Sequence, residues 1–245
     1  MESSNKRLVE YLVSMGYADA RVANAMLSVD RKLFVPVQLE SQAYHDCPLP
    51  IGFGQTISAP SIVAVMSKEL DVRDGMRVLE VGAGSGYHAA ILSQLVGEKG
   101  AVFSVERIPE IAELAKQNLS RIGCKNVEIV VGDGTKGYSQ KAPFDRIIVT
   151  AAAPSIPAPL VEQLKEDGKF IIPVGSTPYW QDLVLLEKKH GEITQRNLLP
   201  VMFVPLIGEY GFNFIGGKSP SVREGMRAET FYIPHNLFLC VNLQT

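Results

Sequence analysis

The spacing of apolar residues changes partway along the chain and divides it into a helical part and an alternating part. In the first part, apolar residues recur every three or four positions over Leu8–Met15 and Val22–Val29, which predicts two amphipathic helices. A third helix is expected over Ala59–Leu70, with Ser58 placed to cap its N-terminus. Residues 1–70 are therefore expected to form an N-terminal helical segment.

The second part alternates short β-branched runs with helical stretches. Strands are expected over Arg77–Val81, Ala101–Val105, Val127–Val131, Arg146–Thr150 and Lys169–Pro173, and helices over Tyr87–Val96, Pro109–Ile122 and Pro159–Leu164. Two further extended runs around His190 and Gly191 predict an antiparallel hairpin. This order predicts an α/β protein with a doubly wound, mostly parallel sheet, helices on both faces and an antiparallel edge hairpin.

The end of the chain departs from this rhythm. Residues 1–212 are expected to form one domain, and residues 213–245 a C-terminal extension. Within the extension, Gly216, Gly217 and Pro220 indicate a linker, and the alternation over 236–243 is typical of a strand. Such an apolar segment is expected to dock, either as an extra structural strand or as part of a substrate or partner site.

Composition narrows the function classes without choosing among them. Apolar residues make up 46% of the 245, and the net charge of −2 suggests no general attraction to nucleic acid or to a membrane surface. No run approaches a membrane span, and the first residues lack the apolar core of a signal peptide, so a cytoplasmic location is expected. The three cysteines and four histidines are dispersed, which argues against a metal site.

The run VLEVGAGSGYHAA, residues 78–90, carries the strongest chemical signal. A buried strand is followed by Gly82, Gly84 and Gly86, and a helix is expected to begin at once. This order presents backbone N–H groups at a helix N-terminus and lets a ligand approach the main chain. A nucleotide-like ligand is therefore expected here.

Two cofactors compete for this turn. Read from Gly84 to Ala89, the run satisfies the loose dinucleotide fingerprint, and Glu106 follows at the distance expected for a ribose contact in NAD enzymes. Against NAD, the acid Glu80 lies beside the turn, where a pyrophosphate would be repelled and an amino or sulfonium group attracted. Asp133 supplies one more acid after the third expected strand of the alternating part.

Acids at successive strand ends resemble those of the class I S-adenosylmethionine (AdoMet)-dependent methyltransferases. The resemblance implies that Glu80 and the glycine turn hold the methionine end of the ligand. It also implies that Glu106 binds the ribose hydroxyls and that Asp133, next to Gly134, binds the adenine amine. These roles agree with chemistry, since hydroxyl and amine groups both donate to carboxylates.

A narrower resemblance covers roughly Leu8 to Phe212. It is to the protein L-isoaspartyl O-methyltransferases, and it lies in the ordered motifs DRKLFVP, IGFGQTISAP, VLEVGAGSGY, VGDGTKGY, PFDRIIVTAAAP, LKEDGKFIIPVG and FVPLIGEYG. It implies methyl transfer from AdoMet to the α-carboxylate of L-isoaspartyl residues in damaged proteins, which begins repair through a succinimide.

The same resemblance assigns the uncharged segment around GQTISAP. It places the Ser58 hydroxyl where methyl donor and acceptor meet, with Thr56 and Ile57 along the same wall. A neutral hydroxyl can hold a carboxylate oxygen, whereas a lysine would pair with the nucleophile and quench it. The resemblance further implies that a strand over Val201–Leu206, including Val204 and Leu206, pairs with the backbone of the isoaspartyl peptide.

Other functions stay open from sequence alone. The small residue at Ser61, where the family often has a larger one, and the C-terminal extension are departures from the pattern. They leave room for a methyltransferase acting on a normal Asp of a dedicated partner peptide. From other classes, an NAD-dependent oxidoreductase and a non-catalytic AdoMet-binding module are the alternatives.

Overall fold

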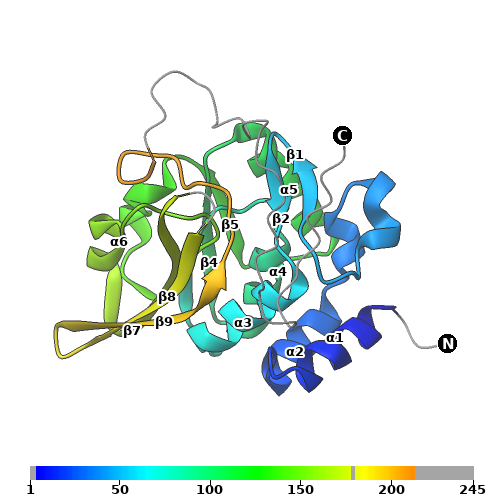
Figure 1. Ribbon diagram of the computed structural model, residues 1–245, viewed down its shortest axis with the longest axis horizontal. Helices are drawn as coiled ribbons and strands as arrows, with labels where there is room; N and C mark the ends of the chain where they lie inside the picture. The colour runs from blue at the N-terminus through cyan, green and yellow to red at the C-terminus, as the bar shows by residue number, and fades with distance from the viewer. Residues whose placement is uncertain (1–3, 178–179, 213–245) are drawn as a thin grey trace, which may run out of the picture.

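A seven-stranded sheet organises the molecule (Figure 1), whose computed structural model describes residues 4–177 and 180–212. The strand order is β5-β4-β3-β6-β7-β8-β9, parallel as far as β7 and antiparallel from β7 to β9. The strands are β3 (Arg77–Val81), β4 (Ala101–Glu106), β5 (Val127–Val131), β6 (Phe144–Val149), β7 (Leu164–Thr177), β8 (Trp180–Lys189) and β9 (Glu192–Val201). A separate two-stranded hairpin consists of β1 (Leu49–Gly52) and β2 (Gln55–Ile57).

Helices cover the two faces of the sheet unequally. They are α1 (Ser4–Ser14), α2 (Ala20–Ser28), α3 (Pro60–Leu70), α4 (Tyr87–Val96), α5 (Pro109–Arg121) and α6 (Ala158–Glu162), with 3-10 turns at Arg31–Phe34, Val37–Gln42, Gly134–Lys136 and Ser139–Lys141. The first five helices pack into one apolar cluster with one face of the sheet, whereas α6 packs into the cluster on the other face. The predicted fold class is confirmed.

Alternation along the central strands creates these two clusters. Val78 and Val102 belong to the cluster on the α1–α5 side, and their neighbours Leu79 and Phe103 belong to the other. Successive side chains of a strand point to opposite faces, so each buried strand feeds both layers of the core. The same alternation decides which polar side chains near the strand ends can face a ligand.

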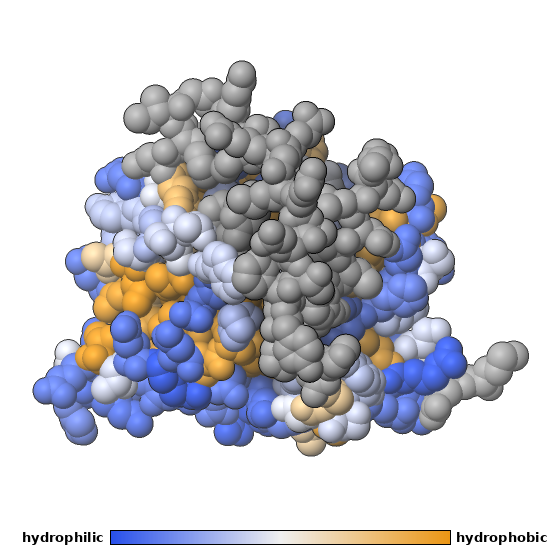
Figure 2. All heavy atoms as spheres, in the orientation of Figure 1, coloured by the Kyte–Doolittle hydropathy of each residue, from blue (hydrophilic) through white to orange (hydrophobic). Residues whose placement is uncertain are grey.

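The antiparallel edge is present where the sequence predicted it. His190 and Gly191 form the turn between β8 and β9, both with positive φ. Leu198, Leu199 and Val201 of β9 are only partly buried, and Figure 2 shows hydrophobic residues gathered over the β8–β9 part of the face in view. This end of the sheet is therefore the less covered one.

The N-terminus of α3 is capped differently from the prediction. The N-cap residue is Ala59, which has no side-chain capping bond, and the Ser61 N–H instead donates to Asp46 Oδ1 at 2.8 Å. The predicted Ser58 cap is therefore wrong, because a carboxylate from a preceding loop already occupies the place that the serine would take. The Ser58 hydroxyl is thereby released from a capping role.

The segment after β9 also differs from the prediction. β9 ends at Val201, and the following residues leave the sheet to form a parallel bridge between Pro205 and Ala152. The Ala152 N–H donates to Val204 O, and the Leu206 N–H donates to Ala152 O. A regular strand over Val201–Leu206 is thus not formed, because the segment turns back over the end of the parallel sheet.

The expected extension at 213–245, including the strand over 236–243, lies outside the described residues. In the part of the chain that the structure describes, no helix is long and apolar enough to cross a membrane.

The cap of α3 is open to test. Asp46→Ala is expected to lower stability by about 1 kcal/mol, because the Ser61 N–H loses its acceptor. Ser58→Ala is expected to leave the melting temperature within about a degree of the wild type, since surface-type changes are usually within ~0.5 kcal/mol. Thermal unfolding of the two variants measures this. An equal loss of stability in Asp46→Ala and Ser58→Ala would indicate that Ser58 caps α3 after all.

Candidate active site

A cavity of about 400 Å³ opens at the carboxyl ends of β3, β4 and β6, where the β1–β2 hairpin and the 204–207 segment also meet. Its lining residues are Phe53, Gly54, Gln55, Thr56, Val81, Gly82, Gly84, Val105, Glu106, Arg107, Ile108, Gly134, Thr150, Ala151, Val204, Pro205, Leu206 and Ile207. Ligands of open parallel α/β sheets bind at this end of the strands. The predicted residues Thr56, Gly82, Gly84, Glu106, Gly134, Val204 and Leu206 are all brought together here.

A second, smaller cavity of about 40 Å³ is lined partly by the same residues. Thr56, Gly82, Gly84 and Thr150 line both cavities. The remaining lining residues of the smaller one are Ile57, Ser58, Val63, Ala83, Ser85, Tyr87 and His88. The predicted residues Ser58 and Ile57 thus lie at one end of a composite site, and Glu106 lies at the other.

The first position of the glycine turn, Gly82, has no room for a side chain. Gly82 has φ +96°, and a Cβ there would lie 2.3 Å from Thr150 Oγ1. Thr150 Oγ1 itself donates to Gly82 O at 2.7 Å and so ties the turn to the end of β6. Gly86 is the N-cap of α4, also with positive φ, and does not line either cavity. It shapes the turn from outside.

Glu106 ends β4 with its carboxylate held in place by two backbone amides. Oε2 accepts from the Gly84 N–H at 3.2 Å, and Oε1 accepts from the Ile108 N–H at 3.0 Å. Each carboxylate oxygen keeps a further lone pair, so the group can still accept from a pair of hydroxyls. Glu106 lines the larger cavity. Its remaining acceptor lone pairs suit the ribose diol that the sequence predicted.

Glu80 lines neither of the two cavities. It is fully buried, and it pairs with Ser104 of β4, whose hydroxyl donates to Glu80 Oε2. Its side chain points to the α1–α5 face, whereas its neighbour Val81 packs on the other face and lines the larger cavity. Burial, and to a lesser extent the nearby Glu106 charge, raises the pKa of Glu80 to about 8. Glu80 is therefore mostly protonated at neutral pH, and its predicted contact with the methionine end of the ligand stays a prediction.

Asp133 is likewise turned away from the cavity. Its Oδ1 accepts from the Thr135 N–H and hydroxyl, and its Oδ2 accepts from the Glu209 N–H at 2.9 Å. Burial acts to raise the pKa of Asp133, but these hydrogen bonds outweigh it and hold the pKa below the ordinary value. The carboxylate anchors the 209–210 turn, and only its neighbour Gly134 reaches the cavity lining. Asp133 does not line the cavity, and its predicted adenine contact stays a prediction.

No charged side chain lines the smaller cavity among the described residues. Burial lowers the pKa of His88 to about 3 and raises the pKa of Tyr87 to about 12, so both are neutral near pH 7. His88 Nε2 lies 3.0 Å from the buried Ser67 hydroxyl. The buried Ser85 hydroxyl has no hydrogen-bond partner in the described structure, so this cavity offers a polar atom for a ligand to satisfy.

Several lining residues were missed by sequence reasoning. Ser85, Tyr87 and His88 belong to the glycine turn and the first turn of α4, and Thr150 follows β6. The rule that ligands gather at the carboxyl ends of parallel strands could have found Thr150. Within the described residues, no cluster of histidine, cysteine or acidic side chains could hold a metal ion.

The site suits AdoMet by volume and by donor set. The larger cavity measures about 400 Å³ and shares four lining residues with the smaller one. Glu106 offers acceptors for ribose hydroxyls at one end, and backbone and hydroxyl groups face the other end. With the parallel sheet and the glycine turn, these features define a Rossmann-like methyltransferase that depends on AdoMet.

Comparison with known proteins specifies the family. The model of the family Protein-L-isoaspartate(D-aspartate) O-methyltransferase (PCMT) matches residues 3–211. The Protein-L-isoaspartate O-methyltransferase of Methanothrix thermoacetophila is 56% identical over 207 residues, covering 84% of this chain and 96% of its own length. That of Methanopyrus kandleri is 56% identical over 212 residues, covering 85% and 93%. The chain belongs to the protein-L-isoaspartate(D-aspartate) O-methyltransferase family.

Solved structures agree with this assignment. A protein-L-isoaspartate O-methyltransferase has a TM-score of 0.77 and 35% identity, covering 84% of this chain and 67% of its own. The Plasmodium falciparum beta-aspartate methyltransferase (PCMT), in complex with S-adenosyl-L-homocysteine, has a TM-score of 0.75 and 32% identity, covering 84% and 99%.

The protonated state of Glu80 makes stability depend on pH. A folded pKa of about 8 lies above the ordinary pKa of 4.5 for a glutamate, so the stabilisation is full below pH 4.5 and is lost as pH rises through 8. Glu80→Gln keeps a neutral side chain at every pH. Its melting temperature is therefore expected to exceed that of the wild type by several degrees at pH 8, with a smaller difference at pH 5.

Melting curves of both proteins between pH 5 and 9 measure this difference. Glu113→Gln, at an exposed position on α5, serves as the matched control and is expected to run parallel to the wild type. A Glu80→Gln curve that also runs parallel to the wild type would mean that Glu80 is ionised in the fold.

The role of Glu106 is tested by binding. Glu106→Ala is expected to weaken AdoMet binding by roughly 1.5–3 kcal/mol, the scale of a hydrogen bond to a charged group. Titration calorimetry measures the dissociation constant, and Glu113→Ala, on the exposed side of α5, should leave it unchanged. An unaltered constant in Glu106→Ala would remove this carboxylate from the ribose.

Proposed function

We propose that this chain transfers the methyl group of AdoMet to the α-carboxylate of L-isoaspartyl residues in damaged proteins. The resulting ester can lose methanol to form a succinimide, whose hydrolysis returns part of the damaged residue to aspartate. The observation that carries the proposal is the composite site, in which Glu106 lies at one end and the uncharged Ser58 cavity lies at the other. Membership of the family supports the substrate class.

The ionised state of the acceptor carboxylate determines which catalytic contributions the protein must make. An unperturbed α-carboxyl has a pKa near ~3.5, so the acceptor is already an anion at neutral pH. When bound, AdoMet supplies an electrophilic methyl on its sulfonium sulfur. No proton has to be removed, so the residues contribute alignment and exclusion of water. Such positioning can contribute up to ~7–11 kcal/mol to lowering a barrier.

Each end of the site has its own task in this proposal. Glu106, fixed by the Gly84 and Ile108 amides, accepts from the ribose hydroxyls and sets the position of the donor. Ser58 donates its hydroxyl to one oxygen of the acceptor carboxylate. Its freedom from capping α3 supports this role. Thr56 lines both cavities and so stands at the junction of donor and acceptor.

The side chains that line the smaller cavity are uncharged, which affects the reactivity of the acceptor carboxylate. A cation beside the acceptor would pair with it and lower its reactivity, whereas an anion would repel it. Neutral His88 and Tyr87 do neither. A buried group that stays uncharged can exclude water without competing for the carboxylate.

The peptide is proposed to lie against the 204–207 segment. Val204 and Leu206 line the larger cavity, and Leu206 is itself mostly buried. Both are tied to Ala152 through backbone hydrogen bonds, so the segment presents a fixed wall. Contact through the main chain would accept varied sequences around the damaged residue. That tolerance suits a repair enzyme.

We also propose a cytoplasmic location and a single catalytic domain over residues 1–212. The family model matches residues 3–211, which supports the extent of this domain.

Paired peptides test the function. Two peptides of one sequence, differing only in isoAsp or Asp at a single position, are assayed with labelled AdoMet. Label is expected in the isoaspartyl peptide, with little in its partner. Equal labelling of the two peptides, or of neither, would contradict the proposal.

Ser58→Ala separates chemistry from binding. The variant is expected to lower kcat by roughly 10- to 100-fold, as for loss of a hydrogen bond of ~1.5–3 kcal/mol to a charged group. AdoMet affinity is expected to change little, because the interaction strengthens with the reacting carboxylate. Steady-state kinetics on the isoaspartyl peptide and calorimetry with AdoMet give the two numbers. An unchanged kcat would exclude Ser58 from the reaction.

A further inference from the structure

The tip of the β1–β2 hairpin holds a residue that its backbone shape disfavours. Phe53 has φ +52° and Gly54 has φ +69°, in a two-residue turn between β1 and β2. A tight hairpin with positive φ at both central positions is a type I′ turn, which favours Asn, Asp or Gly at the first of them. A bulky residue in this region is an outlier. The turn would form more easily without the phenyl ring.

Folding buries little of the apolar surface of the Phe53 ring. Phe53 is 62% exposed, so its burial does not offset the strain of the turn. The same residue nevertheless lines the larger cavity. A strained residue that persists at a cavity rim indicates a functional demand on its side chain.

The position of Phe53 selects one end of the site. It shares the larger cavity with Glu106, Arg107, Ile108 and Gly134, which follow or end strands β4 and β5. It is absent from the smaller cavity that contains Ser58. Phe53 therefore shares a cavity with the carboxylate expected to hold the ribose and lies outside the cavity that contains Ser58, while the 204–207 segment proposed for the peptide lines the same larger cavity.

We infer that Phe53 is a positioning residue whose ring covers the adenosyl moiety of the bound donor. An aromatic ring can stack on the flat face of a nucleobase. Each such stack contributes enough to shift the binding affinity by roughly 10-fold or more. The glycines on both sides, Gly52 and Gly54, also have positive φ. They allow the sharp turn that places Phe53 at the rim of the larger cavity.

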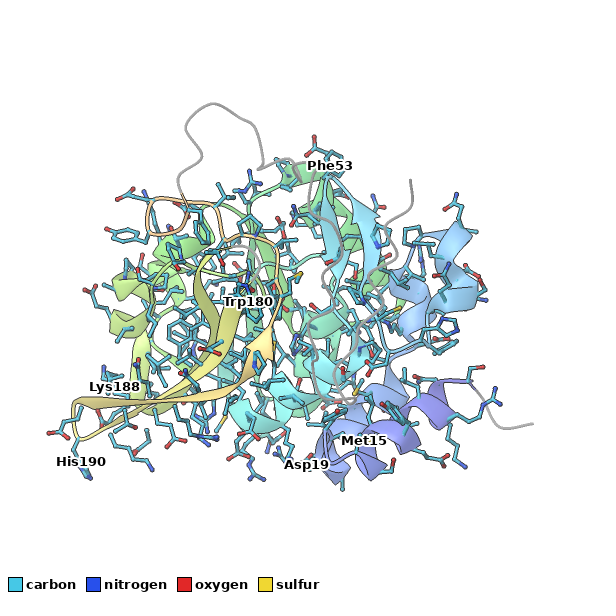
Figure 3. The ribbon with its side chains drawn as sticks, in the orientation of Figure 1. Met15, Asp19, Phe53, Trp180, Lys188 and His190 are labelled. Carbon is cyan, nitrogen blue, oxygen red and sulfur yellow. The ribbon has the colours of Figure 1, made fainter. Side chains whose placement is uncertain are left out.

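A second turn of the same kind provides a matched control. His190 has φ +54° and Gly191 has φ +76°, between β8 and β9. His190 is exposed and does not line either cavity. Figure 3 places Phe53 and His190 at opposite ends of the molecule. The two positions share backbone strain and differ in proximity to the site.

The experiment compares Phe53→Asn, Phe53→Trp and His190→Asn in the full chain. Both Asn variants are expected to melt at or slightly above the wild-type temperature, since Asn suits the turn. By calorimetry, the dissociation constant of S-adenosylhomocysteine is expected to rise about 10-fold in Phe53→Asn. It should stay within about 2-fold of wild type in Phe53→Trp and in His190→Asn. The peptide KM at saturating AdoMet should not change in any of the three.

Three results would overturn the inference. Phe53→Asn could bind S-adenosylhomocysteine as tightly as wild type. It could raise the peptide KM alone, which would place the ring on the acceptor. It could melt well below wild type, which would make the ring structural.

The inference rests on the proposed function only for the identity of the donor. A wild type that binds S-adenosylhomocysteine without methylating the isoaspartyl peptide would refute the proposed reaction and leave the role of Phe53 standing. A wild type that does not bind S-adenosylhomocysteine would refute both.

Discussion

The cost of burying charge governs the carboxyl ends of the parallel strands. A buried ionisable group either gains partners for its charged form or becomes neutral. Glu106 gains two backbone amides at the turns after β3 and β4. Glu80 has only the Ser104 hydroxyl, and its other oxygen has no partner in the described structure, so burial shifts it toward the protonated form. His88 becomes neutral for the same reason.

This division of charge produces the two ends of the site. The donor end contains a carboxylate whose position is fixed before any ligand arrives, because Gly84 and Ile108 hold it. The proposed reacting end contains hydroxyls and a neutral imidazole, which suits a nucleophile that is itself an anion. Methyl transfer between two such ends depends on alignment, and alignment depends on the turn that Gly82 and Thr150 lock together.

Local sequence patterns predicted much of this arrangement. β3, β5 and α4 have the predicted bounds, and the hairpin at His190 and Gly191 lies where the pattern placed it. Strand-to-helix rhythm and turn chemistry act over a few residues, so a single sequence reveals them. Glu106 came from motif spacing and family resemblance; it ends β4 and lines the larger cavity, while its ribose contact stays a prediction.

The contacts that the sequence did not predict share a different cause. The cap of α3 comes from Asp46, which is 15 positions from its partner Ser61, and Asp133 is held by Glu209, which is 76 positions away. Contacts of this length depend on how loops return over the sheet, and no local pattern encodes them. Glu80 lines neither cavity, because it is fully buried and lies two residues before Gly82, so the ligand contact suggested by an acid beside a glycine turn stays a prediction.

The pH dependence of kcat tests the central claim most directly. If the acceptor reacts as an anion against a neutral wall, no enzyme group must lose a proton during turnover. The kcat for an isoaspartyl peptide is then expected to stay level between about pH 5.5 and 7.5, well above the acceptor's own pKa near ~3.5. A rise through this range with an apparent pKa near ~6.5, abolished in His88→Asn, would reveal a general base and contradict the account.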